Sequence, residues 1–473
     1  MRHVHGFACP ARRRLLTQAA KTSIFLSLLF VVVYGATNWL TAQRPVSQIN
    51  TWYFSWELTC IPYLPLLIVP YMSIDLFFFM APFLCRDRKE LRTFRRRVVF
   101  TILVAAAFFL LVPLRLGWPD RPRVDGWFGD FIEQSCSAPF LMEYPHNLFP
   151  AMHIALCMIL AHTYGRHTCV LVRFFLYAWF CLIGFSTVLT WQHHLVDVAG
   201  GLLLGGFAFY LFPELVSRQT VVADVRLGFY YAAGSGLVLA PAAALWPWGV
   251  FLLWPAAGLG IVAAAFFGLG SGIFRKTAGC IPPATRFVLA PVLIGHYLSL
   301  LYYRRRCSAL DEVAEGLLIG RILREDEATL AVEKGVTAVL DLTAEFSETR
   351  PLLKTRYRNI PILDLTAPSQ QQLHEAVAFI AEEAAKGIVY VHCKIGYSRS
   401  AAVACAYLLA RGQAVTAEEA VAWLRSVRPS IIIRPEALNA LRAFAKKASR
   451  PMIATGSLPF IRPRSSDKAT YIN

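Results

Sequence analysis

Eight long apolar stretches in the first 270 residues limit the folds open to this chain more than any other feature. Each is close to the roughly 20 residues that an α-helix needs to cross a bilayer. The composition agrees, because 56% of the 473 residues are hydrophobic and only 16% are charged, which is outside the usual balance of a soluble protein. We therefore predict a polytopic α-helical membrane bundle with spans at residues 22–42, 59–84, 97–116, 148–165, 169–190, 195–213, 227–246 and 248–270.

The basic residues set the expected orientation of these spans. The net charge is +17, but Arg and Lys form short clusters beside apolar runs and are not interleaved with aromatic residues, so nucleic acid is not the expected partner. By the positive-inside rule, the basic N-terminus and the cluster between Arg86 and Arg97 belong in the cytoplasm. Segment 118–147 is then expected outside, and the first span is expected to be uncleaved.

Residues 284–303 form a ninth apolar stretch of a different kind. Basic residues flank it on both sides, and it contains Arg286, Pro291 and His296. We expect a helix that lies in the cytoplasmic interface of the membrane. The 11 cysteines of the chain are scattered without any CxxC pair, so neither a zinc site nor a disulfide framework is expected.

From about Cys307 the composition becomes that of a soluble α/β domain. Residues 336–342 and 387–391 have the character of buried strands, whereas 370–385 and 400–411 have that of helices. Thr416 with Glu419 fits a capping box that opens a further helix. The expected organisation is N-terminal spans with a basic loop (1–94), a membrane domain (95–213), additional spans with the interfacial helix (214–306), the α/β domain (307–449) and a disordered tail (450–473).

A strand-like run, Ile388-Val389-Tyr390-Val391, leads directly into His392-Cys393, and five residues separate Cys393 from Arg399-Ser400 at the start of a helix. A loop of this length can turn its backbone N–H groups inward as an anion nest, to which the helix N-terminus adds its positive end. The same field favours the thiolate of Cys393, and Arg399 can bind two phosphate oxygens in a bidentate fork. Gly396 keeps the loop tight.

Attack of a thiolate on phosphorus needs an acid for the leaving oxygen. Asp364, which lies 29 positions before Cys393 in an extended segment, is the best candidate. Asp341 is the rival, since it also lies at the end of a strand.

These residues resemble the dual-specificity protein tyrosine phosphatases over roughly 308–447, including Glu315 to Gly320 at the start of the domain. Asp364-Leu365-Thr366 and Lys394 are most similar to the branch that contains the mitochondrial phosphatidylglycerophosphate phosphatase, which adds lipid phosphates as possible substrates. The resemblance implies that Cys393 is the phosphocysteine nucleophile, Arg399 binds phosphate, Ser400 assists hydrolysis and Asp364 is acid and then base. The loop residues expected to bind substrate are His392, Lys394, Ile395, Gly396, Tyr397 and Ser398.

A second group of polar residues is expected at the outer face of the membrane. His153 follows Phe149-Pro150 at the start of one span, and His193 and Asp197 start a later one. Asp197 is four residues after His193, so it can orient the imidazole on one helix, and a second His can protonate the leaving group. Ionisable groups within membrane spans are costly and usually functional.

The pattern resembles the type 2 phosphatidic acid phosphatase superfamily over roughly 95–213, in a form similar to the inositol phosphorylceramide synthase branch. The resemblance implies His193 as nucleophile, His153 as acid and Asp197 as the orienting group, with Arg115, Arg121 and Ser186 as phosphate-binding residues. The chain departs from the family pattern at Ala151-Met152 and at Thr187.

The predicted function is that of a multi-pass inner-membrane enzyme of bacterial type with two phosphoester sites. The cytoplasmic site is a cysteine-based phosphomonoesterase for lipid phosphates or phosphoproteins, and the outer site is a lipid phosphatase or headgroup transferase. No metal or other cofactor is expected. The alternative is a protein Tyr/Ser/Thr phosphatase tethered by an inactive membrane domain. The oligomeric state is left open.

Overall fold

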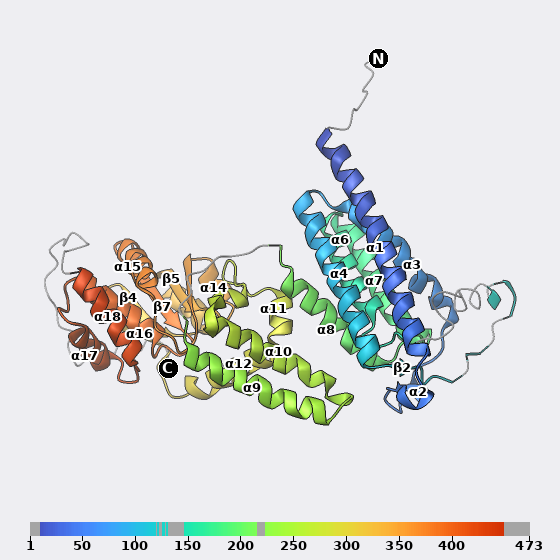
Figure 1. The fold of residues 1–473 in the computed structure, drawn as a ribbon. Helices are drawn as coiled ribbons and strands as arrows, with labels where there is room; N and C mark the ends of the chain where they lie inside the picture. The colour runs from blue at the N-terminus through green and yellow to red at the C-terminus, as the bar shows by residue number, and fades with distance from the viewer. Residues whose placement is uncertain are drawn as a thin grey trace, which may run out of the picture. The chain divides into compact units, whose positions relative to one another are not determined.

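The computed structural model describes residues 10–119, 121–122, 125–127, 129–130, 146–214 and 223–448. The chain forms two compact units, residues 1–215 and 216–473, which we describe separately (Figure 1). The predicted disordered tail and most of the predicted outer segment 118–147 lie outside the described residues.

The first unit is a helical bundle. Its long helices are α1 (Pro10–Ala42), α3 (Ile68–Leu84), α4 (Arg88–Leu111), α6 (Met152–Arg166), α7 (Val170–Leu189) and α8 (Leu195–Leu211). Helix α6 packs against α3, α4, α7 and α8, and α1 packs against α3 and α4. Asp87 caps α4 by accepting hydrogen bonds from the N–H groups of Lys89 and Glu90 at 2.7 and 2.8 Å, which ends the connection from α3 and starts the next helix.

Short elements complete the first unit at one end. They are η1 (Val46–Gln48), α2 (Glu57–Cys60), η2 (Pro65–Leu67) and a parallel pair of two-residue strands, β1 (Asn50–Thr51) and β2 (Leu114–Arg115).

Five helical segments among the described residues are long and apolar enough to cross a membrane: Arg12–Ala42, Pro65–Leu84, Val170–Leu189, Val225–Ala244 and Trp248–Phe274. They coincide with five of the eight predicted spans. The remaining three predicted spans also contain helices, but α4 begins with a run of arginines and α6 and α8 are only 15 and 17 residues long. Several apolar helices are therefore present, whereas the number of eight spans stays a prediction.

The second unit begins with apolar helices and continues into an α/β domain. Helix α9 (Val225–Ala244) is followed by η3 (Trp248–Leu252), α10 (Leu253–Ala264), the π-helical turn η4 (Ala265–Leu269) and η5 (Gly270–Phe274). Two further helices, α11 (Pro283–Val288) and α12 (Ala290–Arg304), cover the predicted interfacial stretch. Helix α10 packs against both α9 and α12, and the three lie side by side below the sheet in Figure 1.

The α/β domain is built on one five-stranded sheet with the order β3-β4-β7-β5-β6. The strands are β3 (Leu310–Ala314), β4 (Leu317–Arg321), β5 (Val336–Thr343), β6 (Arg356–Ile362) and β7 (Ile388–Cys393). Only the β3–β4 pair is antiparallel. Strands β4, β5 and β7 are buried almost throughout, as expected where helices or loops cover both faces of a parallel sheet.

Helices cover the sheet and complete two apolar clusters. The helices are α13 (Glu325–Glu333), α14 (Arg350–Leu353), α15 (Gln370–Ala384), α16 (Arg399–Ala410), α17 (Ala417–Val427) and α18 (Pro435–Ala448). Every residue of α16 is buried, and it packs between β7, α15, α17 and α18. The predicted capping box is confirmed, because Thr416 Oγ1 accepts a hydrogen bond from the Glu419 N–H at 3.1 Å. The predicted α/β class and the predicted strands and helices of this domain are thus confirmed.

The segment between η5 and α11 attaches the apolar helices to the α/β domain. The Lys276 ammonium forms a buried ion pair with Asp341 and donates to the Thr343 carbonyl at 3.1 Å. The Glu348 N–H donates to the Gly279 carbonyl at 2.8 Å. Because both partners of the Lys276–Asp341 pair are excluded from water, breaking it would leave an uncompensated buried charge.

Candidate active site

The loop between β7 and α16 is the centre of the site, and it is closed by one glycine. Gly396 has a φ of 80°, in the left-handed region that favours glycine. A Cβ atom there would come within 2.7 Å of the Gly320 backbone and 2.8 Å of an Arg428 side-chain nitrogen. The predicted tight loop therefore depends on Gly396.

The loop is held in place by three neighbouring segments. The Lys394 carbonyl accepts from the Ile322 N–H at 3.2 Å, and the Tyr397 carbonyl accepts from the Ile432 N–H at 2.9 Å. The fully buried Arg428 donates to the carbonyls of Ile395 and Gly396 at 3.1 and 3.2 Å. These contacts hold carbonyls of the loop from outside, and on the inside the Gly396 N–H donates to Cys393 Sγ at 3.3 Å, as in an anion nest.

Cys393 lies at the base of this loop with its thiol directed toward it. Its Sγ accepts from the Gly396 N–H at 3.3 Å and lies 3.5 Å from the Ser400 hydroxyl. Burial alone would raise the pKa of the thiol, but the charge of Arg399 and the hydrogen bonds from Ser400 and Gly396 outweigh it and lower the pKa below its ordinary value. Cys393 is therefore set up as a thiolate nucleophile.

Arg399 is oriented by a carboxylate that the motif did not reveal. Glu345, in the loop after β5, accepts from the guanidinium at 2.7 and 3.1 Å, and the Ile362 carbonyl accepts at 2.9 Å. Both side chains are almost fully buried. This fork fixes the orientation of the guanidinium. Glu345 follows a strand of the central sheet, which is the only hint of its role in the sequence.

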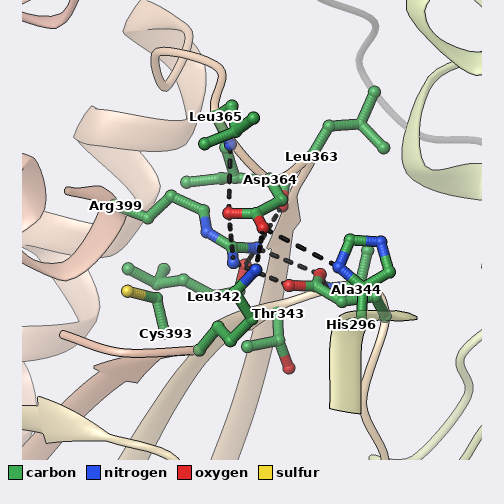
Figure 2. A network of polar contacts seen from close by, with 12 residues as sticks. His296, Leu342, Thr343, Ala344, Leu363, Asp364, Leu365, Cys393 and Arg399 are labelled. Atoms are coloured by element: carbon green, nitrogen blue, oxygen red, sulfur yellow. Dashed lines mark hydrogen bonds and ion pairs between the residues drawn. The ribbon is translucent and has the colours of Figure 1, made fainter. Parts of the chain in front are cut away.

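Asp364 faces the same guanidinium from the loop after β6. Its Oδ1 accepts from Arg399 at 3.1 Å, while Oδ2 pairs with Lys394 and lies 3.8 Å from Nδ1 of His296. Figure 2 shows the carboxylate between Arg399 and the His296 ring. Although burial would raise its pKa, the surrounding Arg399 and Lys394 hold the pKa of Asp364 well below the usual range. A substrate phosphate would compete with Asp364 for Arg399.

Asp341, the rival acid, has a different environment. It is fully buried and does not line the cavity at Cys393. Besides the Lys276 ion pair, it accepts from the Tyr357 hydroxyl and the Thr343 N–H, both at 2.7 Å. The geometry favours Asp364 as the acid and places Asp341 among the contacts that hold the apolar helices to the domain.

His392 also lies behind the site and not in it. Its side chain is 1% exposed, and its Nε2 is 2.7 Å from a Glu348 carboxylate oxygen. Burial would lower the pKa of His392, but Glu348 and Asp341 raise it. The predicted contact of His392 with substrate is therefore replaced by a supporting role under the loop.

The site opens into a cavity of about 570 Å³. Its floor contains the predicted residues Asp364, Cys393, Lys394, Ile395, Tyr397, Ser398 and Arg399. The opposite wall comes from α9, α10 and α12 and consists of Tyr231, Leu259, Pro291, Val292, Gly295, His296, Ser299 and Tyr303. None of these wall residues was predicted as part of the site, since local motifs do not show which distant helix will cover a loop.

Two groups of His and carboxylate side chains among the described residues have potential ligand atoms within 4.8 Å of one another: His296, Glu345 and Asp364, and Asp341, Glu348 and His392. In the first group Arg399 and Lys394 already balance the carboxylates, and in the second Lys276 pairs with Asp341. These cations would repel a metal ion, so we assign no metal to either group.

The first unit brings its three predicted polar residues together. The rings of His153 and His193 have centroids 6.0 Å apart, and Nδ1 of His193 lies 3.6 Å from Oδ2 of Asp197. Asp197 also accepts from the His194 N–H at 2.9 Å, and Tyr71 stacks on His153 at 4.5 Å between centroids. His193 and Asp197 are 5% and 1% exposed.

The predicted phosphate-binding residues of this second group are less well placed. Arg121 donates to the Trp191 carbonyl at 3.2 Å, next to the turn that carries His193. Arg115 is exposed. The buried Ser186 donates back to the Ile183 carbonyl of its own helix at 2.7 Å. A buried pair that was not predicted, His194 with Glu57 at 2.9 Å, supports the same turn.

A buried thiolate at the base of an anion-binding loop, an oriented guanidinium and a facing carboxylate define a cysteine-dependent phosphatase. Comparison with known proteins agrees. The model of the dual-specificity phosphatase catalytic domain matches residues 324–447. A rat protein named phosphatidylglycerophosphatase and protein-tyrosine phosphatase 1 is 34% identical over 143 residues, which are 28% of this chain and 73% of the rat protein.

Two other similarities are of the same kind. The phosphatidylglycerophosphate phosphatase PTPMT1 of Arabidopsis thaliana is 31% identical over 132 residues, 26% of this chain and 38% of that protein. A solved structure, the crystal structure of PTPMT1 in complex with PI(5)P, aligns with 30% of this chain and 97% of its own chain at 27% sequence identity and a TM-score of 0.28. Through its C-terminal domain, the chain belongs to the dual-specificity phosphatase family. The predicted resemblance is thereby confirmed for this domain.

Proposed function

We propose that this chain is a membrane-bound phosphatase that removes the phosphomonoester group of a phospholipid by way of a phosphocysteine at Cys393. The observation that carries this proposal is the cavity itself. Its floor has the groups for phosphoryl transfer, and its opposite wall is made by apolar helices that precede the phosphatase domain. In a lipid phosphate, the phosphate headgroup would bind at this floor and the acyl chains would contact this apolar wall.

The chemistry follows from the positions of the side chains. The substrate phosphate takes over Arg399 and so removes the largest of the charges that hold the pKa of Asp364 down, which lets Asp364 carry a proton. The Cys393 thiolate forms the S–P bond as the P–O bond to the lipid breaks, and Asp364 gives this proton to the leaving oxygen. Arg399 and the loop N–H groups hold the three other phosphate oxygens. Water then attacks phosphorus, Asp364 takes its proton, the S–P bond breaks and Ser400 assists the departing thiolate. Asp364 regains the proton it lost, so the two steps release alcohol and phosphate.

Helix α12 gives a second reason to favour a lipid. Its outer surface exposes Ile294, Leu298, Leu301 and Tyr302, and Arg304, Arg305 and Arg306 follow at its end. An apolar band beside a basic cluster is typical of a helix in the membrane interface. The mouth of the cavity would then face the headgroups of the cytoplasmic leaflet. The Arabidopsis relative is named a phosphatidylglycerophosphate phosphatase, which supports the same substrate class, and the name of the rat relative contains both this lipid activity and a protein-tyrosine phosphatase.

Purified full-length protein tests this proposal with three substrates: a long-chain lipid phosphomonoester in mixed micelles, glycerol phosphate and a phosphotyrosine peptide. We expect the lipid to have the highest kcat/KM, and Cys393→Ser to abolish its hydrolysis. Preference for the peptide would instead favour a protein phosphatase tethered by a membrane domain. Undiminished lipid hydrolysis by Cys393→Ser would reject the cysteine site as the source of the activity.

The role of the apolar wall can be tested with a matched pair of glycines. A Cβ at Gly295 on α12 or at Gly236 on α9 meets no atom within 4 Å, but only Gly295 lines the cavity. We expect Gly295→Leu to lower kcat/KM for the lipid at least about tenfold and to leave glycerol phosphate hydrolysis nearly unchanged. Gly236→Leu should behave as wild type on both.

A second candidate function is a phosphoryl-transfer site in the first unit. The closeness of His153, His193 and Asp197 favours this function. In addition, two buried polar atoms, Nδ1 of His193 and Oδ1 of Asp197, have no hydrogen-bond partner among the described residues. Unpaired polar atoms in a buried site are costly. We propose that His193 attacks a lipid phosphoester, with Asp197 orienting its ring and His153 protonating the leaving group, in hydrolysis or headgroup transfer at the outer face of an inner membrane.

The Cys393→Ser variant separates the two sites. Headgroup release or transfer is measured in this variant and in Cys393→Ser/His193→Ala. If this activity persists in Cys393→Ser and disappears in Cys393→Ser/His193→Ala, the activity belongs to the first unit. If Cys393→Ser alone removes every activity on lipid mixtures, the first unit has no catalytic role.

A further inference from the structure

His296 is the one imidazole that lines the phosphatase cavity, as far as the described residues show. It comes from α12, before the segment matched by the phosphatase family model. Its Nδ1 lies 3.8 Å from Oδ2 of Asp364, and the two side chains are 10% and 18% exposed. Its ring lies nearly perpendicular to that of Phe346, with centroids 6.4 Å apart. A histidine from outside the catalytic domain thus faces the candidate acid.

The two oxygens of Asp364 face different partners. Oδ1 faces Arg399, which a substrate phosphate would bind, and Oδ2 faces Lys394 and His296. When phosphate takes over Arg399, Oδ1 is left facing the phosphate and its leaving oxygen. Oδ2 then needs partners on its own side to keep the carboxyl group in that rotamer, and Lys394 is one of them.

His296 fits this requirement as a neutral ring. Burial is the largest effect and lowers the pKa of His296. The charges of Glu345 and Asp364 raise it, and those of Lys394 and Arg399 lower it, so that the pKa lies below its ordinary value. A neutral imidazole can donate one N–H to Oδ2 without adding a second positive charge to that of Lys394. Two cations at Oδ2 would favour the ionised carboxylate, whereas the acid must carry a proton.

We propose that His296 is a positioning residue of the phosphatase reaction, which holds Oδ2 of Asp364 so that Oδ1 delivers the proton to the leaving oxygen. The helix that forms the apolar wall of the cavity thereby also completes the environment of the acid. The inference rests on the proposed cysteine-based phosphatase activity, but it does not depend on whether the natural substrate is a lipid.

Two soluble substrates that differ in leaving group test this role. p-Nitrophenyl phosphate releases a phenolate that needs little protonation, whereas phenyl phosphate releases one that needs an acid. We expect His296→Ala to lower kcat about tenfold on phenyl phosphate and less than about twofold on p-nitrophenyl phosphate, with unchanged KM. His296→Asn, which keeps an N–H near the position of Nδ1, should recover most of the loss. Tyr297→Ala, at a neighbouring residue that is 54% exposed, is the control for a substitution on this helix.

A double-mutant cycle with Asp364→Asn separates positioning from a structural effect. If His296 acts through Asp364, then His296→Ala/Asp364→Asn is no slower on phenyl phosphate than Asp364→Asn alone. Equal losses on both substrates, or losses that multiply in the double variant, would overturn the proposal. Full activity of Cys393→Ser on both substrates would instead reject the phosphatase function on which it rests.

Discussion

At the scale of single residues, the site depends on a few positions where chemistry leaves little choice. Cys393 is useful only as a thiolate, and its surroundings lower its pKa although it is buried. Gly396 is useful because it has no Cβ at a φ of 80°. The effect on Cys393 is local, because Gly396, Arg399 and Ser400 lie within seven residues of it in the chain, whereas the space at Gly396 is limited by the distant Gly320 and Arg428.

The pH dependence of alkylation tests the state of Cys393. Iodoacetamide reacts with the thiolate and not with the thiol. Because the pKa of Cys393 is lowered, its rate should reach half of its plateau at a lower pH than that of Cys307, whose pKa burial raises. Mass spectrometry of quenched samples gives both rates in one protein. A Cys393 midpoint at or above that of Cys307 would contradict the assignment of a resting thiolate.

Gly396→Ala should damage catalysis by a steric route. The new Cβ would meet the Gly320 backbone and Arg428 and would require a strained φ, so the loop has to open. We expect kcat on p-nitrophenyl phosphate to fall at least about a hundredfold, in the range of a lost oxyanion donor, while the protein stays folded. Gly412→Ala, also at positive φ but with open space around it, should keep its activity.

At the scale of elements, the phosphate loop works because other elements hold it. Strand β7 carries Cys393 to its end and α16 begins at Arg399, but the shape of the loop between them depends on β3, β4 and the segment after α17. Arg428 joins these parts. It donates to the Ser308 carbonyl and hydroxyl at 3.1 and 2.9 Å and forms an ion pair with Asp311, besides its two bonds to the loop.

Arg428→Lys should therefore cost both stability and activity. A lysine ammonium has three donors at one point and cannot span the loop and the Ser308 segment. We expect a loss of about 2–3 kcal/mol in the free energy of unfolding, as for lost hydrogen bonds of a charged group, and a lower kcat on soluble substrates. Chemical denaturation and steady-state kinetics measure the two effects. Arg442→Lys, at an exposed ion pair, is the control, with an expected change of at most about 0.5 kcal/mol.

At the scale of the second unit as a whole, the apolar helices and the phosphatase domain share one site. The cavity has walls from both, and the buried Lys276–Asp341 pair joins them near it. Under the proposed function, this arrangement would direct a domain of the dual-specificity phosphatase family toward a lipid substrate.

Lys276→Met tests this attachment. It leaves the Asp341 carboxylate buried without its cation, which costs about 3–5 kcal/mol. We expect a lower thermal unfolding midpoint and a larger fall in lipid hydrolysis than in p-nitrophenyl phosphate hydrolysis. Lys276→Met/Asp341→Asn removes the unpaired charge and should regain much of the stability but not the lipid activity. Equal losses on both substrates would show that the pair only stabilises the fold.

The sequence by itself determined those parts of the protein that short spacing encodes. The apolar stretches predicted helices. The run from Ile388 to Val391 predicted a strand, and the eight residues from His392 to Arg399 predicted an anion-binding loop and a helix N-terminus, because a loop of that length allows few backbone paths. Asp364 was predicted from its place in an extended segment 29 positions before Cys393. These features need no knowledge of how distant segments pack.

Only the tertiary structure decided which distant residues complete the site. Glu345, His296 and Arg428 lie 54, 103 and 29 positions from Arg399, yet each contacts the loop or its acid. Their side-chain types are common on protein surfaces, so no local pattern distinguishes them. Asp341 and Asp364 both lie at strand ends in the sequence, where Asp364 was the preferred acid. They differ because packing buries one against Lys276 and leaves the other facing the cavity, and long-range packing is a property of the whole folded chain.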